Sequence, residues 1–133
     1  MLLQPKRTRH KKIRKGTLPK YKFNSLQFGD LGLRALESGM VTSRQIEATR
    51  QAINRKLNRK GKIWIRVFPT TPLSKTPIGS RMGKGKGSIS HWVSKVASGK
   101  ILFEVCSKNI QISTIALKAG KPKLPLKTKI IKF

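Results

Sequence analysis

Helical and strand patterns that alternate along one chain predict an α+β fold. Three observations carry this prediction: a capped amphipathic helix that begins at Thr42, a β-branched run at residues 63–68, and two strand patterns within residues 89–106. The chain has 133 residues, a length that allows one domain of ordinary size. Hydrophobic residues make up 37% of it, which is below the usual share but sufficient for a modest core.

Residues 1–22 form a cationic arm rather than a regular element. The arm carries nine lysines and arginines, no acid, and no sustained apolar period. Such a segment is extended when free and is ordered by its partner, so we expect it to bind rather than to be only a solvated tail. We expect residues 23–133 to form a single domain.

A strand-like pattern then runs over residues 21–36. Apolar and polar residues alternate at 21–23 and again at 26–28, and Gly29-Asp30 indicates a turn or bulge. Leu31 and Leu33 continue the alternation on one face.

The clearest helix begins at Thr42, because Thr42 and Gln45 have the spacing of a capping box. Apolar positions recur behind them at helical spacing, namely Ile46, Thr49, Ile53 and Leu57. This stripe predicts packing on a sheet, with the basic side chains outside it. Gly61 is the expected end of the helix.

Residues 63–68 are predicted to form a strand with Ile63, Ile65 and Val67 on one face. Three prolines within residues 69–77 then interrupt regular structure. We therefore expect residues 69–88 to form a long loop, and loops of this length in compact domains are usually functional or disordered.

Two further strands are predicted at residues 89–96 and 100–106, and the turn residues 97–99 between them favour a hairpin. Residues 110–119 are predicted to form a second helix with Ile112, Ile115 and Ala116 on one face. Gly120 and Pro122 end that helix. A last strand is expected over residues 127–133.

Glycines alternate with cations in residues 80–88, within the expected loop. Missing Cβ atoms let a backbone approach another surface closely, and the cations suit contact with phosphates. The segment does not match a P-loop, because the second glycine would fall on Lys84, nor a dinucleotide fingerprint, which would need glycine at Ser88. A flexible surface loop with incidental lysines stays open as the alternative.

The net charge and the few acids, histidines and cysteines of the chain limit the classes of function that it can have. The chain has 31 lysines and arginines against 4 acids, for a net charge of +27, which predicts a polyanionic partner. No two acids lie close in sequence, which argues against paired-carboxylate catalysis. Cys106, His10 and His91 are too few for a structural zinc site, and Cys106 is expected to be a half-buried strand residue. Trp92 is either a base-stacking surface or a core residue, and its strand pattern favours the core.

Several short motifs occur in the order found in one family. They are LQPKRT at residues 3–8, RQIEA at 44–48, GKIWIRVFP at 61–69, RMGKGKG at 81–87 and KLPLKT at 123–128. On these motifs the chain closely resembles the bacterial-type large-subunit ribosomal protein sixteen family over nearly its whole length. The C-terminal helix departs from the family's glutamate-rich pattern, which leaves its contacts open.

The resemblance implies a two-layer sandwich of two main helices on a mixed, largely antiparallel sheet, with a basic N-terminal arm and a long glycine-rich basic loop. It also implies a structural component of the large ribosomal subunit, not an enzyme, that needs no cofactor or metal. Such a protein binds large-subunit rRNA and helps to position aminoacyl-site tRNA near the peptidyl-transferase centre. Neighbouring ribosomal proteins are further expected partners, whereas a membrane and a homo-oligomer are not.

Two sets of residues are expected to carry these contacts. The rRNA-binding set is Lys6, Arg7, Arg9, Lys11, Lys12, Arg14, Lys15, Arg55, Arg59, Lys60 and Arg66. The tRNA-proximal loop set is Arg81, Met82, Gly83, Lys84, Gly85, Lys86 and Gly87.

Two alternative functions remain open. A membrane-surface cationic protein would need a helix with a broad apolar face and interfacial aromatics, which the helix at Thr42 lacks. A nucleotide-hydrolysing enzyme is the third reading. The 13 isoleucines and 21 lysines suggest an AT-rich genome, and the family start lies almost at Met1. These features favour a mitochondrial ribosome, with a plastid or a bacterial cytoplasm as alternatives.

Overall fold

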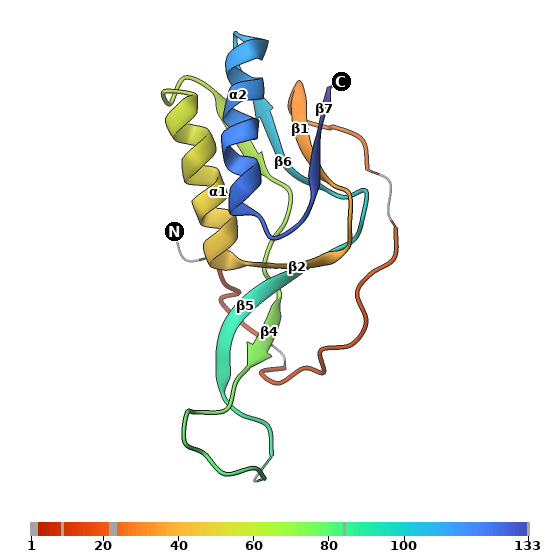
Figure 1. Cartoon of the computed structure of the whole chain (residues 1–133), viewed down its shortest axis with the longest axis vertical. Helices are drawn as coiled ribbons and strands as arrows, with labels where there is room; N and C mark the ends of the chain where they lie inside the picture. Colours follow the sequence, from red (N-terminus) through yellow and green to blue (C-terminus); the bar gives the residue numbers. More distant parts are fainter. Residues whose placement is uncertain (1–2, 9, 22–23, 84, 133) are drawn as a thin grey trace.

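The computed structural model describes residues 3–8, 10–21, 24–83 and 85–132. Within them two helices pack on one side of a β-sheet, and a second, smaller sheet extends from this body (Figure 1), so the α+β class is confirmed. In chain order the elements are β1 (Leu31–Ala35), β2 (Gly39–Thr42), α1 (Ser43–Lys56), β3 (Lys62–Ile65), β4 (Thr71–Ser74), β5 (Ile89–Val96), β6 (Ile101–Cys106), α2 (Ile110–Gly120), the 3-10 helix η1 (Lys121–Lys123) and β7 (Thr128–Lys132).

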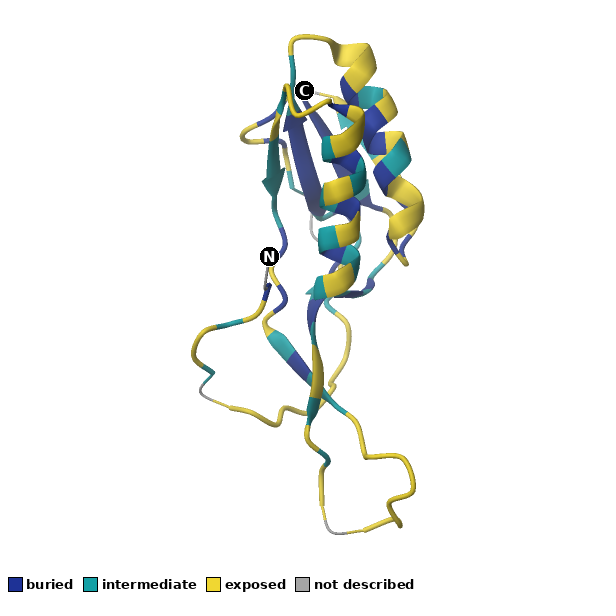
Figure 2. Ribbon diagram, turned by 90° about the vertical axis from the view of Figure 1, so that its left-hand side faces the viewer, coloured by how far each residue is buried: buried dark blue, intermediate teal, exposed yellow. Residues whose placement is uncertain are grey.

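The described strands form two antiparallel sheets. The first sheet has the order β3-β6-β1-β7 and lies behind the two helices. The second sheet has the order β2-β5-β4, and its β4–β5 hairpin projects away from the helices (Figure 1). The core lies between the first sheet and the helices, where Leu33, Phe103, Ile46, Ile53 and Leu117 are fully buried (Figure 2).

Helix α1 begins as its sequence predicts. The hydroxyl of Thr42 accepts a hydrogen bond from the backbone N–H of Gln45 at 3.2 Å, and the Gln45 side-chain oxygen accepts one from the Thr42 N–H at 2.9 Å. This capping box satisfies two backbone donors at the helix start. The predicted stripe at Ile46, Thr49, Ile53 and Leu57 is buried, which confirms that face.

The predicted end of α1 at Gly61 is wrong. The helix ends at Lys56, and Asn58 and Arg59 turn the chain with positive φ angles of 49° and 60°. Gly61 serves another purpose, because a Cβ there would lie 3.0 Å from the carbonyl oxygen of Cys106. The glycine lets the start of β3 approach β6 closely.

The predicted apolar face of α2 is only partly buried. Ala116 is buried, but Ile112 and Ile115 are exposed, and the other buried positions are Ser113, Leu117 and Gly120. A Cβ at Gly120 would lie 2.8 Å from a side-chain carbon of Ile53. The small residues face inward because α1 and α2 pack closely together, and this requirement outweighs the hydrophobicity of the isoleucines.

The hairpin predicted at residues 97–99 is also wrong. Strand β5 pairs with β2 and β4, whereas β6 pairs with β1 and β3 in the other sheet. Two hydrogen bonds to Ala35 fix the connection from β5 to β6. The Ala35 carbonyl accepts from the Gly99 N–H at 2.8 Å, and the Ala35 N–H donates to the Lys100 carbonyl at 2.9 Å. The two strands are consecutive in sequence but belong to different sheets.

Two predicted segments change their limits. The described part of residues 21–36 is a strand only at β1, because the backbone N–H groups of residues 27, 28 and 29 donate to the Glu104 carboxylate rather than to a neighbouring strand. Residues 69–88 contain strand β4, which leaves residues 75–88 as the loop. Pro72 is tolerated in β4 because this strand lies at the edge of the second sheet. Residues 22, 23 and 133 of the predicted strands lie outside the described residues.

Candidate nucleic-acid interface

The loop of the β4–β5 hairpin, residues 75–88, is the most exposed part of the described chain (Figure 2). Its base is closed by a hydrogen bond from the Lys75 N–H to the Ser88 carbonyl at 3.1 Å. At its tip Ile78 and Met82 are 98% and 101% exposed, and Arg81 is exposed beside them. The tip therefore makes almost no contact with its own chain and is free for a partner.

The glycines of this loop do two different things. Gly83 and Gly85 have φ angles of 114° and 83°, and a Cβ at either position would meet nothing within 4 Å. Their backbone is open to the outside and can approach another surface closely. At Gly87 a Cβ would lie 2.5 Å from the Lys75 carbonyl oxygen, so this glycine permits the two sides of the loop to meet.

The N-terminal arm is anchored at its start. Leu3 is buried in the core cluster, and the chain then runs over the surface toward the hairpin (Figure 1). The predicted arm cations within the described residues are all exposed: Lys6, Arg7, Lys11, Lys12, Arg14 and Lys15. Arg9 lies outside the described residues.

Lysines hold the arm against the hairpin. Lys12 Nζ donates to the Lys86 carbonyl oxygen at 2.6 Å, and Lys86 Nζ donates in return to the carbonyl of Ile13. On β5, Lys95 Nζ donates to the Lys15 carbonyl at 2.5 Å. We call residues 4–20 and 71–95 together the cationic extension, because these contacts join two predicted sets that lie far apart in sequence.

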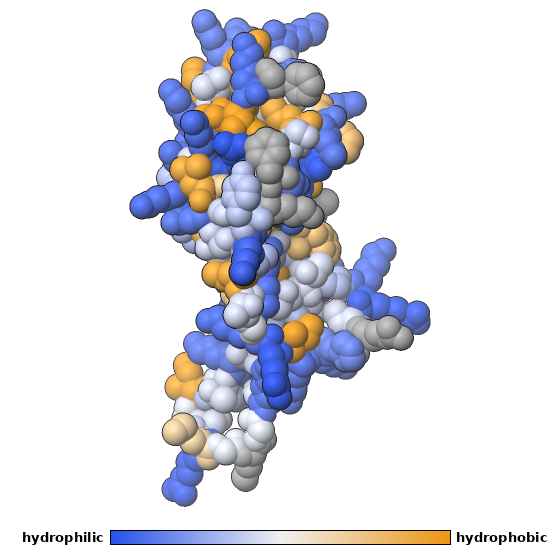
Figure 3. Space-filling model, turned by 90° about the vertical axis from the view of Figure 1, so that its right-hand side faces the viewer, coloured by the Kyte–Doolittle hydropathy of each residue, from blue (hydrophilic) through white to orange (hydrophobic). Residues whose placement is uncertain are grey.

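The cationic extension contains no acid, and all four acids of the chain are used elsewhere. Glu47 pairs with Arg50 at 2.6 Å, and this hydrogen-bonded guanidinium lowers the pKa of Glu47 to about 2. Glu37 accepts from the Lys127 N–H at 2.7 Å. Figure 3 shows one face of the molecule, where hydrophilic side chains extend along its whole length and apolar groups stay separate. The extension therefore depends on something outside the chain to balance its charge.

Glu104 is completely buried and is paired with Arg66. Its Oε1 atom lies 3.0 Å from Arg66 Nη1, while its Oε2 atom accepts from the N–H groups of residues 27, 28 and 29 at 2.7 to 3.1 Å. Arg66 also donates to the Gln27 side-chain oxygen at 2.6 Å. Arg66 thus has a structural role in the fold, and its contact with rRNA stays a prediction.

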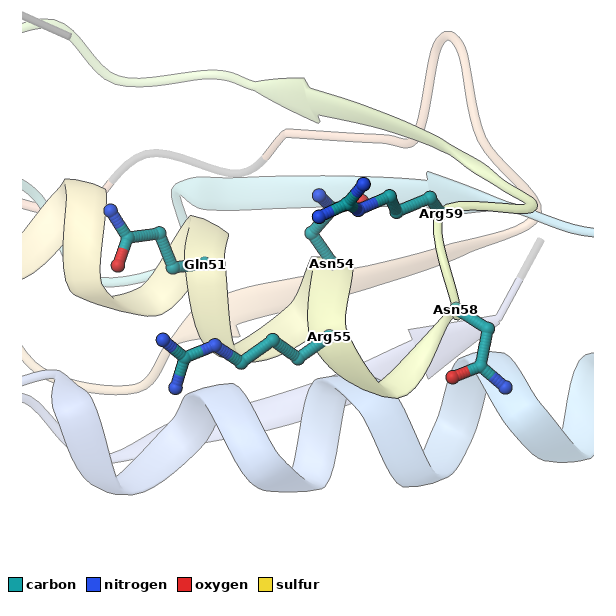
Figure 4. A pocket seen from close by; sticks show the side chains of 5 residues that line it. All are labelled: Gln51, Asn54, Arg55, Asn58 and Arg59. Atoms are coloured by element: carbon teal, nitrogen blue, oxygen red, sulfur yellow. The ribbon is translucent and has the colours of Figure 1, made fainter.

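The outer face of α1 carries a second polar surface. Gln51, Asn54, Arg55, Asn58 and Arg59 line an open hollow of about 590 Å³ (Figure 4). Arg55, Arg59 and the exposed Lys60 belong to the predicted rRNA set, but the sequence reasoning missed the three amides. Gln51 and Asn54 lie about one turn apart on α1 and Asn58 lies in the turn after the helix, and their spacing at i, i+3 and i+7 in the sequence is the signal that could have found them. Amides and guanidinium groups on one stripe suit hydrogen bonding to phosphates and base edges.

The structure therefore brings together only part of the predicted site. The arm cations lie beside the loop with Arg81, Met82, Gly83, Gly85, Lys86 and Gly87, whereas the C-terminal end of α1 lies at the other end of the molecule (Figure 1). Lys84 lies outside the described residues. Near the hairpin base, His91 is exposed and Trp92 is half-buried, and both line a further hollow of about 590 Å³ with Leu3 and Gln4.

The geometry gives no support to the other chemistries. The glycine loop connects two strands, whereas a P-loop leads into a helix. Among the described residues, no helix is long and apolar enough to span a bilayer, and no three His, Cys, Asp or Glu side chains group into a metal site. Cys106 is half-buried on β6 as predicted, and a hydrogen bond to Asp30 raises the pKa of its thiol.

Known proteins resemble the chain over almost all of its length. Residues 4–131 match the family described as ribosomal protein L16p/L10e. The large ribosomal subunit protein uL16 of Hyphomonas neptunium is 52% identical over 134 residues, covering 98% of this chain and 96% of its own. Those of Protochlamydia amoebophila and Blochmanniella pennsylvanica are 47% and 48% identical, again over 98% of this chain and over 96% and 98% of theirs.

These relatives are bacterial proteins of the large ribosomal subunit, and their family is structural rather than enzymatic. The predicted resemblance and the prediction that the chain is not an enzyme are therefore confirmed. This chain belongs to the L16p/L10e family of ribosomal proteins and is a structural component of the large ribosomal subunit.

Proposed function

We propose that this chain binds large-subunit rRNA through the arm and the outer stripe of α1, and that its glycine loop lies beside aminoacyl-site tRNA near the peptidyl-transferase centre. In this proposal residues 1–22 are a binding arm, residues 23–133 are the RNA-binding domain, and the functional segment is 69–88. Neighbouring ribosomal proteins cover part of the remaining surface.

One observation carries the proposal. Arm and loop lie side by side, and the residues that join them carry lysines and arginines but no carboxylate. Clustered cations of this kind neutralise RNA phosphates and release counterions, which sets the position of the protein without reading sequence. The open backbone at Gly83 and Gly85 supports close approach of the loop to the tRNA.

The rRNA contact is tested by the salt dependence of binding to rRNA fragments. About 6–10 phosphate contacts would weaken binding by three or more decades between roughly 50 and 200 mM salt. Replacement of Lys6, Arg7 and Lys11 by glutamine should reduce the slope of log affinity against log salt by about 2. The matched control replaces Lys118, Lys129 and Lys132, which are also exposed but lie on α2 and β7. A salt-insensitive affinity, or equal effects of the two triple variants, would contradict the proposal.

The tRNA contact is tested at Arg81. Because Arg81 lies at the loop tip, Arg81→Ala should leave subunit assembly intact and slow tRNA accommodation in ribosomes that carry the variant. Lys118→Ala on α2 is the matched control and should accommodate tRNA normally. Normal accommodation with Arg81→Ala would overturn the assigned role.

We infer a mitochondrial ribosome as the compartment, on the lysine and isoleucine content of the chain. A plastid and a bacterial cytoplasm are the alternatives, and the relatives named above are bacterial. Fractionation of ribosomes from the source cells, followed by immunodetection of this chain, separates the three.

A further inference from the structure

An aromatic groove lies beside β3, at the start of the N-terminal arm. Phe28 and Phe68 are 57% and 46% exposed, which is unusual for large aromatic side chains. Between them is a hollow of about 510 Å³ lined by Leu3, Phe28, Ile65, Arg66, Val67 and Phe68. None of the phosphate-binding roles proposed above uses these two rings.

The groove lies at β3, the edge strand of the first sheet, and part of its lining belongs to the face that the helices leave uncovered. Trp64 pairs in register with Glu104, and Ile63 pairs with Val105. Ile63 and Val105 pack into the core beneath the helices, so Trp64 and Glu104, one residue along, point to the opposite face. Residues 27–29 cover part of that face, where their N–H groups bind Glu104.

The Phe28 wall is held rigidly. Its ring stacks on Trp64 with centroids 6.1 Å apart and planes inclined by 20°. The Arg66 guanidinium lies 4.8 Å from the same ring centroid. Glu104 and Gln27 fix that guanidinium from the other side. The indole and the fixed guanidinium together hold the Phe28 ring in place, so this wall of the groove is preorganised, while the exposed Phe68 ring forms the opposite wall.

The surroundings decide which flat group fits. Glu104 is completely buried and already neutralised by Arg66, and Asp30, two residues after Phe28, is exposed and hydrogen-bonded to the Cys106 thiol. Lys6 and Arg7, three and four residues beyond Leu3, are exposed cations. The chain as a whole carries +27, so a ligand that combines a flat apolar ring with a negative backbone is complementary to the site. Unpaired nucleotides of single-stranded RNA have this combination, and bases in a duplex do not present their faces.

We propose that the groove between Phe28 and Phe68 is a stacking site for one unpaired base of an RNA single strand, bulge or loop. This inference rests on the proposed rRNA binding and adds to it a distinct, salt-insensitive contact. The base stacks on the Phe68 ring, beside the fixed Phe28 wall, while its flanking phosphates face the cations at the start of the arm. The site does not select one base, because every base has a face that can stack, but purines stack more strongly than pyrimidines.

Phe68→Leu is the central test, because it keeps an apolar side chain and removes the ring. The full chain is titrated with a fluorescent oligoadenylate and, separately, with an RNA duplex of equal length, at several salt concentrations. Phe68→Leu should weaken oligoadenylate binding about fivefold or more. It should leave duplex binding and the salt slope unchanged. Phe68→Tyr should bind oligoadenylate like the unaltered chain, and Ile115→Ala, at an exposed apolar position on α2, is the control for lost surface area.

A second measurement uses Trp64 as the reporter. In a Trp92→Phe background, oligoadenylate should quench the fluorescence of Trp64, because the bound base lies beside the Phe28 ring that stacks on Trp64. Oligoadenylate binding that is equal in Phe68→Leu and the unaltered chain, or the absence of quenching, would overturn the inference while salt-dependent rRNA binding persists. An equal loss of duplex binding would assign the groove to a general RNA or protein contact instead. If the unaltered chain binds no RNA in a salt-dependent way, the proposed function itself fails.

Discussion

Positive charges are balanced differently in the cationic extension and in the rest of the chain, which we call the body. In the body, Arg50 pairs with Glu47 and Arg66 pairs with the buried Glu104. In the extension, the lysines at positions 12, 86 and 95 donate to backbone carbonyls, and no carboxylate is present. The body therefore places its acids in internal contacts with some of its own cations, whereas the extension keeps all of its charge for a partner.

The same difference holds for apolar contacts. The body buries Leu33, Phe103 and Leu117 completely, whereas Ile78 and Met82 at the loop tip are fully exposed. Stability thus depends on the body, and the extension is built for binding without adding to the core. Substitutions in the body should change unfolding, and substitutions in the extension should change RNA binding with little effect on unfolding.

The largest expected effect on stability is that of Glu104→Ala. The substitution leaves Arg66 without its buried partner and removes the acceptor of three backbone N–H groups. Loss of one partner of a buried ion pair costs about 3–5 kcal/mol, which urea unfolding would measure. Glu37→Ala, at an exposed acceptor, is the control and should cost about 1 kcal/mol or less. Equal costs for the two variants would mean that the body does not depend on its buried pair.

A pair of glycine substitutions compares the two regions directly. Gly120→Ala places a Cβ 2.8 Å from an Ile53 side-chain carbon between the helices, and such overpacking costs about 1–3 kcal/mol. Gly85→Ala meets no atom within 4 Å, and the open loop can change its φ without disturbing the core. Its free energy of unfolding, measured in urea, should stay within about 0.5 kcal/mol of that of the unaltered chain. The division between body and extension is wrong if Gly85→Ala destabilises the chain as much as Gly120→Ala.

The smallest expected effect is the acid dependence contributed by Glu47. Because Arg50 lowers the pKa of Glu47 from 4.5 to about 2 in the folded chain, the pair stabilises the fold fully above pH 4.5. That contribution is lost as the pH falls from 4.5 through about 2. Solvent screens this partly exposed pair, so it contributes about 1 kcal/mol or less. Urea midpoints measured across this range should fall less steeply in Glu47→Gln than in the unaltered chain.

Local signals in the sequence predicted the regular elements well. The capping box at Thr42 and the helical stripe through Ile53 depend on neighbouring residues, and both are confirmed. The same holds for the last strand, β7. The strand predicted at residues 63–68 is confirmed only as far as Ile65, where β3 ends. These features need no knowledge of what lies across the core.

The errors arose where a distant contact decides the structure. Gly99 turns the chain between sheets because of hydrogen bonds to Ala35, and the inner face of α2 is chosen by the approach of Gly120 to Ile53. Glu104 ends the strand pattern of residues 21–36 from more than 70 positions away.

The candidate site was also only partly predictable. Charge and glycine content pointed to the arm and to the loop at Arg81 separately. Their contact through Lys12 and Lys86 could not be predicted, because two cationic segments are expected to repel one another. The amides on α1 and the groove at Phe68 were missed because neither carries a charge pattern.

The burial of Leu3 has a further consequence for the arm. With Leu3 in the core and Leu26 buried at the other end, the segment between them is tethered at both ends rather than free at one. A tethered segment samples far fewer positions than a tail of the same length, so most of its ordering cost is met when the chain folds. Once one cation of the arm meets a phosphate, the others are already at a high effective concentration near the same strand. The arm should thus engage RNA as a single unit.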